Sequence, residues 1–273
     1  MKILIGTDFS KASENAIEYT TQIARNFIAE VVLVHSYLPP MVDPSIPVGM
    51  LEANEMTVIK EFDEILEKKV RKLRESGVRA SYKVVIGDLR HAFEEVTKDT
   101  EPADLIVLGK TENPDFLDKL IGSTSQHLLN QVQVPLLVVP ENYPVTLPKA
   151  FAYATQLEFE ESGIIKKVKE MSGRLKSKLH FVKVQLDNDL DINPDLPLIK
   201  EINGITGLEK TEVDYVNAES LKEGLSAYIK DHDISLLVLA SHKRGLLDGI
   251  LAPSQSRKLL SKIKIPVLIY HFT

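Results

Sequence analysis

The chain has 273 residues, a length that suits two domains of moderate size, and 44% of its residues are hydrophobic while 26% are charged. The formal net charge of −6 argues against nucleic-acid binding, because a phosphate backbone is held by clustered Lys and Arg. The chain has no Cys, which excludes disulfides, thiolate catalysis and cysteine zinc sites and fits a reducing cytoplasm.

No hydrophobic stretch approaches the roughly 20 residues that a transmembrane helix needs. The first residues run directly into the apolar segment 3–5, without the basic region and apolar core of a signal peptide. These features predict a cytoplasmic protein that contacts neither membrane nor nucleic acid.

Strand and helix patterns alternate along the first half of the sequence. Short apolar runs predict buried strands at residues 3–6, 31–34, 105–108 and 136–139, and a further strand is expected at 82–86. Apolar positions at helical spacing predict helices at 12–27 after a Ser10 N-cap, at 51–76, at 90–98 and at 123–130. The basic cluster at 68–74 lies beside acidic residues in the second helix, so it is expected to form a solvated helix face.

The second half repeats the first. Residues 253–271 align without a gap with residues 122–140, and residues 235–240 align with 104–109. A repeat this long is a duplicated domain rather than a solenoid, whose units span about 20–50 residues. Strands are expected near 150–154, 179–184, 211–216, 235–239 and 266–270, and the counterpart of the long second helix is reduced to the segment 188–204.

Strands that are apolar on both faces and are separated by helices form parallel sheets between helix layers. Right-handed crossovers make such a sheet doubly wound. We therefore expect an α/β chain of two tandem doubly wound domains, each with a five-stranded parallel sheet flanked by helices. The Pro-containing segment 140–148 predicts a first domain at residues 1–143 and a second at 144–273.

Ligands of open α/β sheets bind at the carboxyl ends of the strands, where the strand order reverses. In the first half, the segments 7–10, 35–37 and 109–125 are expected to meet there. Gly109 ends one strand, and Gly122 and Ser123 open the next helix, where small residues let backbone N–H groups approach an anion. The alternative interpretation is a plain turn at Gly122 with a Ser N-cap.

The Asp after the first strand, the spacing Gly109-x2-Glu112-x9-Gly122-Ser123 and the segment 126–139 resemble the universal stress protein family. The resemblance covers essentially the whole chain, as a tandem two-domain member with an adenine-nucleotide α-hydrolase-like fold. Nucleotide-binding members carry the pattern G-x2-G-x9-G-(S/T). The resemblance implies ATP or AMP in the first domain, with Asp8 at the ribose and phosphate side and the backbone of Val34 and His35 beside the base. It also implies a phosphate loop made of Gly109, Gly122, Ser123 and Thr124.

Glu112 departs from this pattern, because it stands where the family has its second Gly. A Cβ restricts the backbone there, and a carboxylate repels a polyphosphate unless a cation or Lys110 intervenes. The departure disfavours a triphosphate and is compatible with adenosine or AMP. The second half departs further: Ala240, Lys243 and Pro253 replace the three glycines, and 154–156 contain no Asp, so this site is expected to be degenerate.

No catalytic constellation is visible in the sequence. His91, His127 and the other His residues show no ligand spacing with carboxylates, so no metal is expected. The leading hypothesis is a non-enzymatic stress-response protein that holds an adenine nucleotide. The alternatives are a ligand-free scaffold that acts through protein partners and a slow ATP hydrolase.

The resemblance also implies pairing through the last strand of each domain, an edge that would otherwise be exposed. Residues 136–139 and 267–270 can pair within one chain or between two chains as a homodimer, and the sequence leaves both arrangements open.

Overall fold

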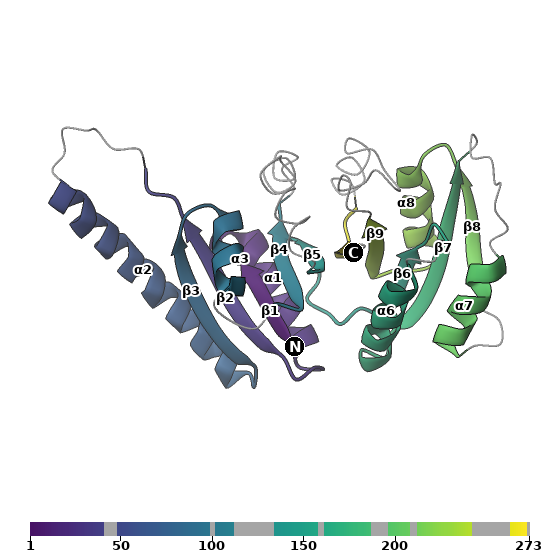
Figure 1. Ribbon diagram of the computed structural model, residues 1–273, viewed down its shortest axis with the longest axis horizontal. Helices are drawn as coiled ribbons and strands as arrows, with labels where there is room; N and C mark the ends of the chain where they lie inside the picture. The colour runs from purple at the N-terminus through teal and green to yellow at the C-terminus, as the bar shows by residue number, and fades with distance from the viewer. Residues whose placement is uncertain are drawn as a thin grey trace.

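The computed structural model describes residues 1–40, 48–98, 102–111, 134–157, 161–186, 196–207, 212–241 and 263–271 (Figure 1). The first half comprises β1 (Lys2–Gly6), α1 (Lys11–Ala24), β2 (Glu30–Tyr37), α2 (Val48–Glu75), β3 (Arg79–Ile86), α3 (Leu89–Lys98), β4 (Leu105–Lys110) and β5 (Leu136–Pro140). The second comprises β6 (Ala150–Ala154), α6 (Ser162–Arg174), β7 (Lys178–Leu186), α7 (Leu196–Thr206), β8 (Val213–Ala218), α8 (Leu221–Asp231), β9 (Leu236–Ser241) and β10 (Val267–His271). The helix expected at 123–130 lies outside the described residues.

The ten strands of the described residues form one sheet in the order β3-β2-β1-β4-β5-β10-β9-β6-β7-β8. Strand pairs within each half are parallel, and the two halves join through the antiparallel pair β5–β10, in which Leu137 lies opposite Leu268. The predicted fold class, tandem doubly wound α/β domains, is confirmed. The last strands pair within one chain, and β3 and β8 are the two edges of the sheet.

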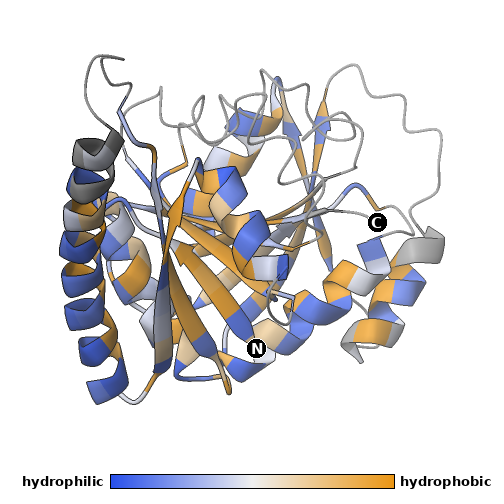
Figure 2. Ribbon diagram, turned by 60° about the vertical axis from the view of Figure 1, so that its left-hand side comes forward, coloured by the Kyte–Doolittle hydropathy of each residue, from blue (hydrophilic) through white to orange (hydrophobic). Residues whose placement is uncertain are grey.

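Two apolar layers cover the faces of the sheet. On one face, Phe93 of α3 and Leu225 of α8 belong to a continuous buried cluster. On the other, α1, α2 and α6 contribute the buried side chains Tyr19, Leu66 and Ile165. Figure 2 shows hydrophobic strands between helices whose outer sides are hydrophilic. Burial on both faces explains why inner strands such as β1 and β5 are nearly all-apolar runs, whereas the edge strands β3 and β8 contain charged residues.

The structure corrects several element ends. β2 continues past the predicted 31–34 to Tyr37, because β3 pairs with it as far as Ile86. α1 ends at Ala24 rather than at Phe27, where the chain changes to short-range turns such as Phe27 N–H to Ala24 O.

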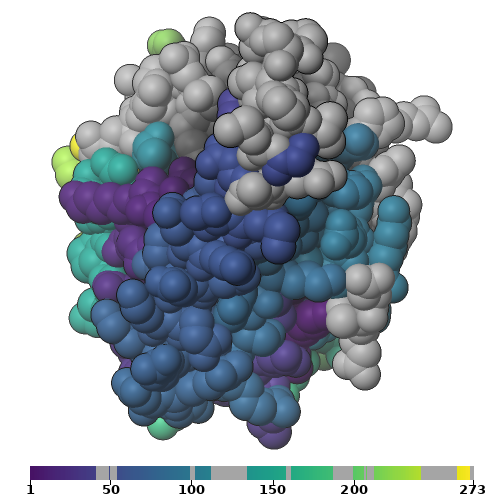
Figure 3. Space-filling view, turned by 90° about the vertical axis from the view of Figure 1, so that its left-hand side faces the viewer, coloured from purple at the N-terminus to yellow at the C-terminus, as the bar shows by residue number. Residues whose placement is uncertain are grey.

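The long helix of the first half has a shorter counterpart, as predicted. α2 has 28 residues and α7 has 11. Figure 3 shows α2 lying across the end of the molecule, over the edge strand β3. Among the described helices, none is long and apolar enough to cross a membrane.

Candidate functional site

The strand order reverses at β1, which lies between β2 and β4. The carboxyl ends of β1 and β4 therefore border the position at which doubly wound sheets bind ligands. Asp8 follows β1, His35 lies in the last part of β2, and Gly109 lies at the end of β4. The predicted residues Gly122, Ser123 and Thr124, with Glu112, lie outside the described residues.

A fixed turn connects β1 with α1. Thr7 N–H extends the sheet by donating to Val34 O at 2.9 Å, and Phe9 N–H donates to Thr7 Oγ1 at 3.2 Å. Phe9 has a φ of 64°, in the left-handed region that is uncommon for a residue with a side chain. Ser10 N–H donates to Asp8 Oδ1 at 3.0 Å. This turn holds the exposed Asp8 carboxylate at the switch point.

The Asp8 carboxylate is ionised at neutral pH. Burial raises its pKa, but hydrogen bonds from Ser10 and Ser13 lower it by more, so the net pKa lies below the usual value. The amino end of α1, capped by Ser10 Oγ accepting from Ser13 N–H at 3.3 Å, also favours a negative charge. Asp8 is thus an acceptor-only group that is available to a ligand.

The two predicted β2 residues are already engaged in the fold. The Val34 carbonyl accepts the Thr7 N–H. His35 is buried, and its Nδ1 lies 2.7 Å from Thr7 O, so Nδ1 carries the proton. Its ring packs against Phe9 and Phe62, with centroids 4.5 and 4.4 Å away. Sequence reasoning missed this aromatic contact, because Phe62 lies in α2, far from His35 along the chain.

Close packing explains why residue 109 is a glycine, without any ligand. A Cβ there would lie 2.2 Å from both the carbonyl carbon and the oxygen of Ala12, so α1 could not approach β4 as closely. The next residue, Lys110, is buried and donates from Nζ to Ile263 O at 2.9 Å, in the second half. Lys110 therefore ties the halves together.

The second half repeats two hydrogen bonds and the left-handed residue of the first turn. Thr155 N–H donates to Val182 O at 2.9 Å, Leu157 N–H donates to Thr155 Oγ1 at 2.9 Å, and Leu157 also has a φ of 64°. Gln156 stands between them, where the first half has Asp8. The duplication seen in the sequence thus extends to backbone conformation.

A buried carboxylate distinguishes the second turn. Glu161 is 1% exposed and stands at the start of α6. It accepts hydrogen bonds from Thr155 Oγ1 at 2.6 Å and from Gln156 N–H at 2.8 Å. The Glu161 side chain therefore takes two of the donors at the amino end of this helix. The repeat alignment did not reveal Glu161, because the connection before α6 is longer than the one before α1.

Surface hollows lined by described residues lie at the amino ends of the strands, opposite the carboxyl ends where the predicted site residues lie. One contains Lys2, Glu30 and Arg79, near the amino ends of β1, β2 and β3. Another lies between the halves and contains Asp104 and Arg174. Neither includes a predicted site residue.

The fold and the duplicated turn define a class of protein: a chain of two tandem doubly wound α/β units. The universal stress protein family matches residues 1–140 and 165–271. The chain belongs to the universal stress protein family.

Curated relatives align with about half of the chain. A universal stress protein of Methanocaldococcus jannaschii is 32% identical over 143 residues, which cover 50% of this chain and 81% of the relative. Universal stress protein A of Escherichia coli K12 is 31% identical over 146 residues, covering 50% of this chain and 92% of the relative.

A solved structure matches the whole tandem arrangement. The crystal structure of a universal stress protein from Archaeoglobus fulgidus covers 99% of this chain and 96% of its own, with a TM-score of 0.74 and 19% sequence identity. At that identity the likeness concerns the fold.

Proposed function

We propose that this universal stress protein is a non-enzymatic stress-response protein that binds one adenine nucleotide with few phosphates, AMP rather than ATP. The site is the carboxyl edge of β1 and β4 in the first half. The observation that carries the proposal is the Asp8 carboxylate, which is exposed, ionised and fixed by Ser10 N–H at the point where the strand order reverses. Such a carboxylate accepts hydrogen bonds from ribose hydroxyls.

The phosphate is proposed to lie at the start of the helix that follows β4. Gly122, Ser123 and Thr124 would supply backbone N–H groups and hydroxyls there, as helix amino ends do for anions. Glu112 limits the number of phosphates, because like charges a few ångströms apart repel. The backbone after Val34 is proposed to border the base.

We further infer that the second half holds no nucleotide at the matching edge. Gln156 replaces the ionised acceptor, and the buried Glu161 carboxylate already takes the amide and hydroxyl donors of the turn. Glu161 would also repel a phosphate at the start of α6.

Calorimetric titration of the full chain with AMP tests the proposal. Native protein and the Asp8→Asn variant are compared with Asp88→Asn, a matched control in which the altered carboxylate also accepts a helix-start amide, that of His91, at 2.7 Å. We expect the control to bind AMP like native protein and Asp8→Asn to bind about tenfold more weakly, since a hydrogen bond to a charged group contributes about 1.5–3 kcal/mol. Equal affinity in both variants would overturn the role of Asp8.

A Glu112→Gly variant tests the phosphate limit. Removal of the carboxylate and its Cβ is expected to strengthen ATP binding by about tenfold or more and to leave AMP binding nearly unchanged. An unchanged preference for AMP would show that Glu112 does not set the number of phosphates.

The second candidate function is a ligand-free scaffold that acts through protein partners. It is favoured by the packing role of Gly109 against Ala12 and by the local bond of Asp8 to Ser10, since neither feature needs a ligand. An absence of heat with both AMP and ATP, together with no nucleotide retained through purification, would support this function instead.

A further inference from the structure

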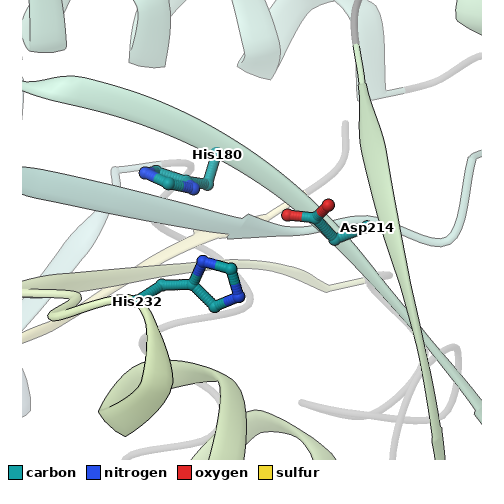
Figure 4. Close-up of side chains that lie close together, drawn as sticks. All are labelled: His180, Asp214 and His232. Atoms are coloured by element: carbon teal, nitrogen blue, oxygen red, sulfur yellow. The ribbon is translucent and has the colours of Figure 1, made fainter.

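Two imidazoles and a carboxylate converge in the second half. His180 of β7, Asp214 of β8 and His232, which follows α8, each place a ligand-type atom within 4.8 Å of the other two. Figure 4 shows the three side chains facing a common space. The three residues are far apart in the sequence, so no spacing motif could predict that they lie together.

The register of the sheet explains why His180 and Asp214 lie close together. Asp214 lies opposite Val182 in the parallel pair β7–β8, and side chains alternate between the faces of a strand. His180 is two residues from Val182, so both His180 and Asp214 point to the face that α8 covers. Val182 packs on that face with Leu225 of α8.

The third residue, His232, lies at the carboxyl end of α8. His232 is the C-cap of α8, and its N–H donates to Tyr228 O at 3.1 Å. Asp233 follows with a φ of 49°, and Ile234 N–H donates to Ile229 O at 2.9 Å. This is a Schellman turn, which fixes the backbone of His232. The negative end of the helix dipole also faces the cluster and favours a cation there.

Tyr228 holds two of the three groups in place. Its hydroxyl donates to Asp214 Oδ2 and lies 3.3 Å from His180 Nδ1. Its ring stacks on the His232 ring with centroids 4.1 Å apart. Because Tyr228 contacts Asp214 through one oxygen, the second carboxylate oxygen is not taken by that bond.

We propose that His180, Asp214 and His232 bind a divalent transition-metal ion, for which Zn²⁺ is the probe. Imidazole nitrogen and carboxylate oxygen are the ligands of zinc, at about 2.0–2.2 Å, whereas magnesium and calcium take oxygen ligands. Ligand atoms in a tetrahedral shell of that radius lie roughly 3.5 Å apart, so a small rotation of the exposed His232 ring closes the shell.

The surroundings suit an ion with three protein ligands. His232 is exposed, which leaves the remaining coordination position open to water. The cluster lies near the amino ends of β7 and β8, so it is separate from the carboxyl edge at which a nucleotide is proposed.

The ion would join three elements, including the edge strand β8. Its expected effects are one equivalent of Zn²⁺ bound per chain and a higher thermal midpoint in the presence of Zn²⁺, since a ligand that binds only the native state stabilises it.

The test is a zinc titration of the full chain without an affinity tag, followed by calorimetry and by thermal unfolding. Native protein is compared with His232→Gln, with Asp214→Asn and with His91→Gln. His91 is the matched control, because it is also an exposed His beside a carboxylate, Glu95 at 3.3 Å, but lies in α3 of the first half. Asn keeps an acceptor for Tyr228, so Asp214→Asn is expected to fold.

Native protein and His91→Gln are expected to bind one Zn²⁺ and to gain the same thermal stability. His232→Gln and Asp214→Asn should bind Zn²⁺ at least about tenfold more weakly and lose that gain. Substitution of Co²⁺ should give a visible absorption band in native protein that His232→Gln lacks. An absence of zinc binding by native protein, or equal binding by His232→Gln and His91→Gln, would overturn the proposal.

Discussion

At Gly109 the main chain of β4 passes so close to α1 that a Cβ atom would lie 2.2 Å from the Ala12 carbonyl. The sequence predicted this residue as part of a phosphate loop, and the structure adds a packing requirement that operates without any ligand. The packing role of Gly109 is shown by the structure, its phosphate-binding role stays a prediction, and substitutions can distinguish the two.

We predict that Gly109→Ala destabilises the chain by about 1–3 kcal/mol, because the contact is with backbone that moves only if α1 moves. Urea unfolding measures the change. Gly173→Ala in α6 is the control, since nothing lies within 4 Å of its added Cβ, and it should be neutral or stabilising by about 0.5–1 kcal/mol. Equal unfolding midpoints for the two variants would contradict the packing role.

Asp8 makes stability depend on pH in the acid range. Its pKa is lower in the folded chain than the ordinary value of 3.8, so its stabilising contribution is present above that value and is lost as pH falls through the folded pKa. The urea midpoint of native protein should therefore exceed that of Asp8→Asn at pH 7, and the gap should narrow at an acid pH below 3.8, as the Asp8 carboxylate of the folded chain becomes protonated. A gap of the same size at both pH values would show that the ionised form of Asp8 is not favoured by folding.

The sequence predicted some of the candidate site residues but not others. Asp8 and Gly109 could be predicted as candidate site residues, because each lies at or shortly after the end of an apolar run. Glu161 and the cluster of His180, Asp214 and His232 were missed, because they depend on loop length and strand register. These quantities are set by contacts between distant segments.

At the scale of elements, the turns after β1 and β6 share a Thr hydroxyl acceptor and a left-handed residue but lead to different helix starts. Ser10 caps α1, whereas the N-cap of α6, Glu161, makes no side-chain cap bond. Ser220 caps α8 by accepting from Glu223 N–H at 3.3 Å. Helix starts thus diverged while the preceding strands kept their conformation.

We predict that Ser10→Ala and Ser220→Ala each destabilise the chain by about 1 kcal/mol, the usual contribution of an N-cap side chain. Chemical denaturation of the two variants gives both values. Midpoints within experimental error of native protein would mean that backbone or solvent satisfies these helix ends without the hydroxyl.

Strand existence was predictable from all-apolar runs, but strand length was not. β2 is long because β3 continues to pair with it, and this partner is separated from it by the whole of α2. α1 is shorter than its apolar pattern, because the pattern continues into a turn whose residues Phe27 and Ala29 are still packed. Local periodicity therefore marks burial more reliably than it marks element ends.

At the scale of the whole molecule, the antiparallel pair β5–β10 joins two parallel sheets into one, and both apolar layers continue across the junction. Lys110 to Ile263 O and Tyr143 Oη to Ser235 O, at 2.9 and 3.0 Å, add polar links between the halves. The sequence left this pairing open, because a last strand has the same pattern whether its partner belongs to its own chain or to another.

Since the last strands are satisfied within one chain, we predict a monomer of 30.6 kDa in solution. Light scattering after gel filtration over a range of protein concentrations measures the mass. A constant mass of twice that value would show that another surface, such as an edge at β3 or β8, joins two chains.

The central proposal is that the two halves differ in ligand binding. The first half binds a nucleotide at the carboxyl ends of its strands, near Asp8. The second half binds none, because Glu161 occupies the matching position. The number of AMP molecules bound per chain at saturation, measured by equilibrium dialysis, tests this proposal most directly. We expect one AMP per chain in native protein at saturation. At the AMP concentration that half-saturates native protein, we expect Asp8→Asn to hold only about 0.1 AMP per chain, in line with tenfold weaker binding. Two AMP per chain, or none in native protein, would contradict it.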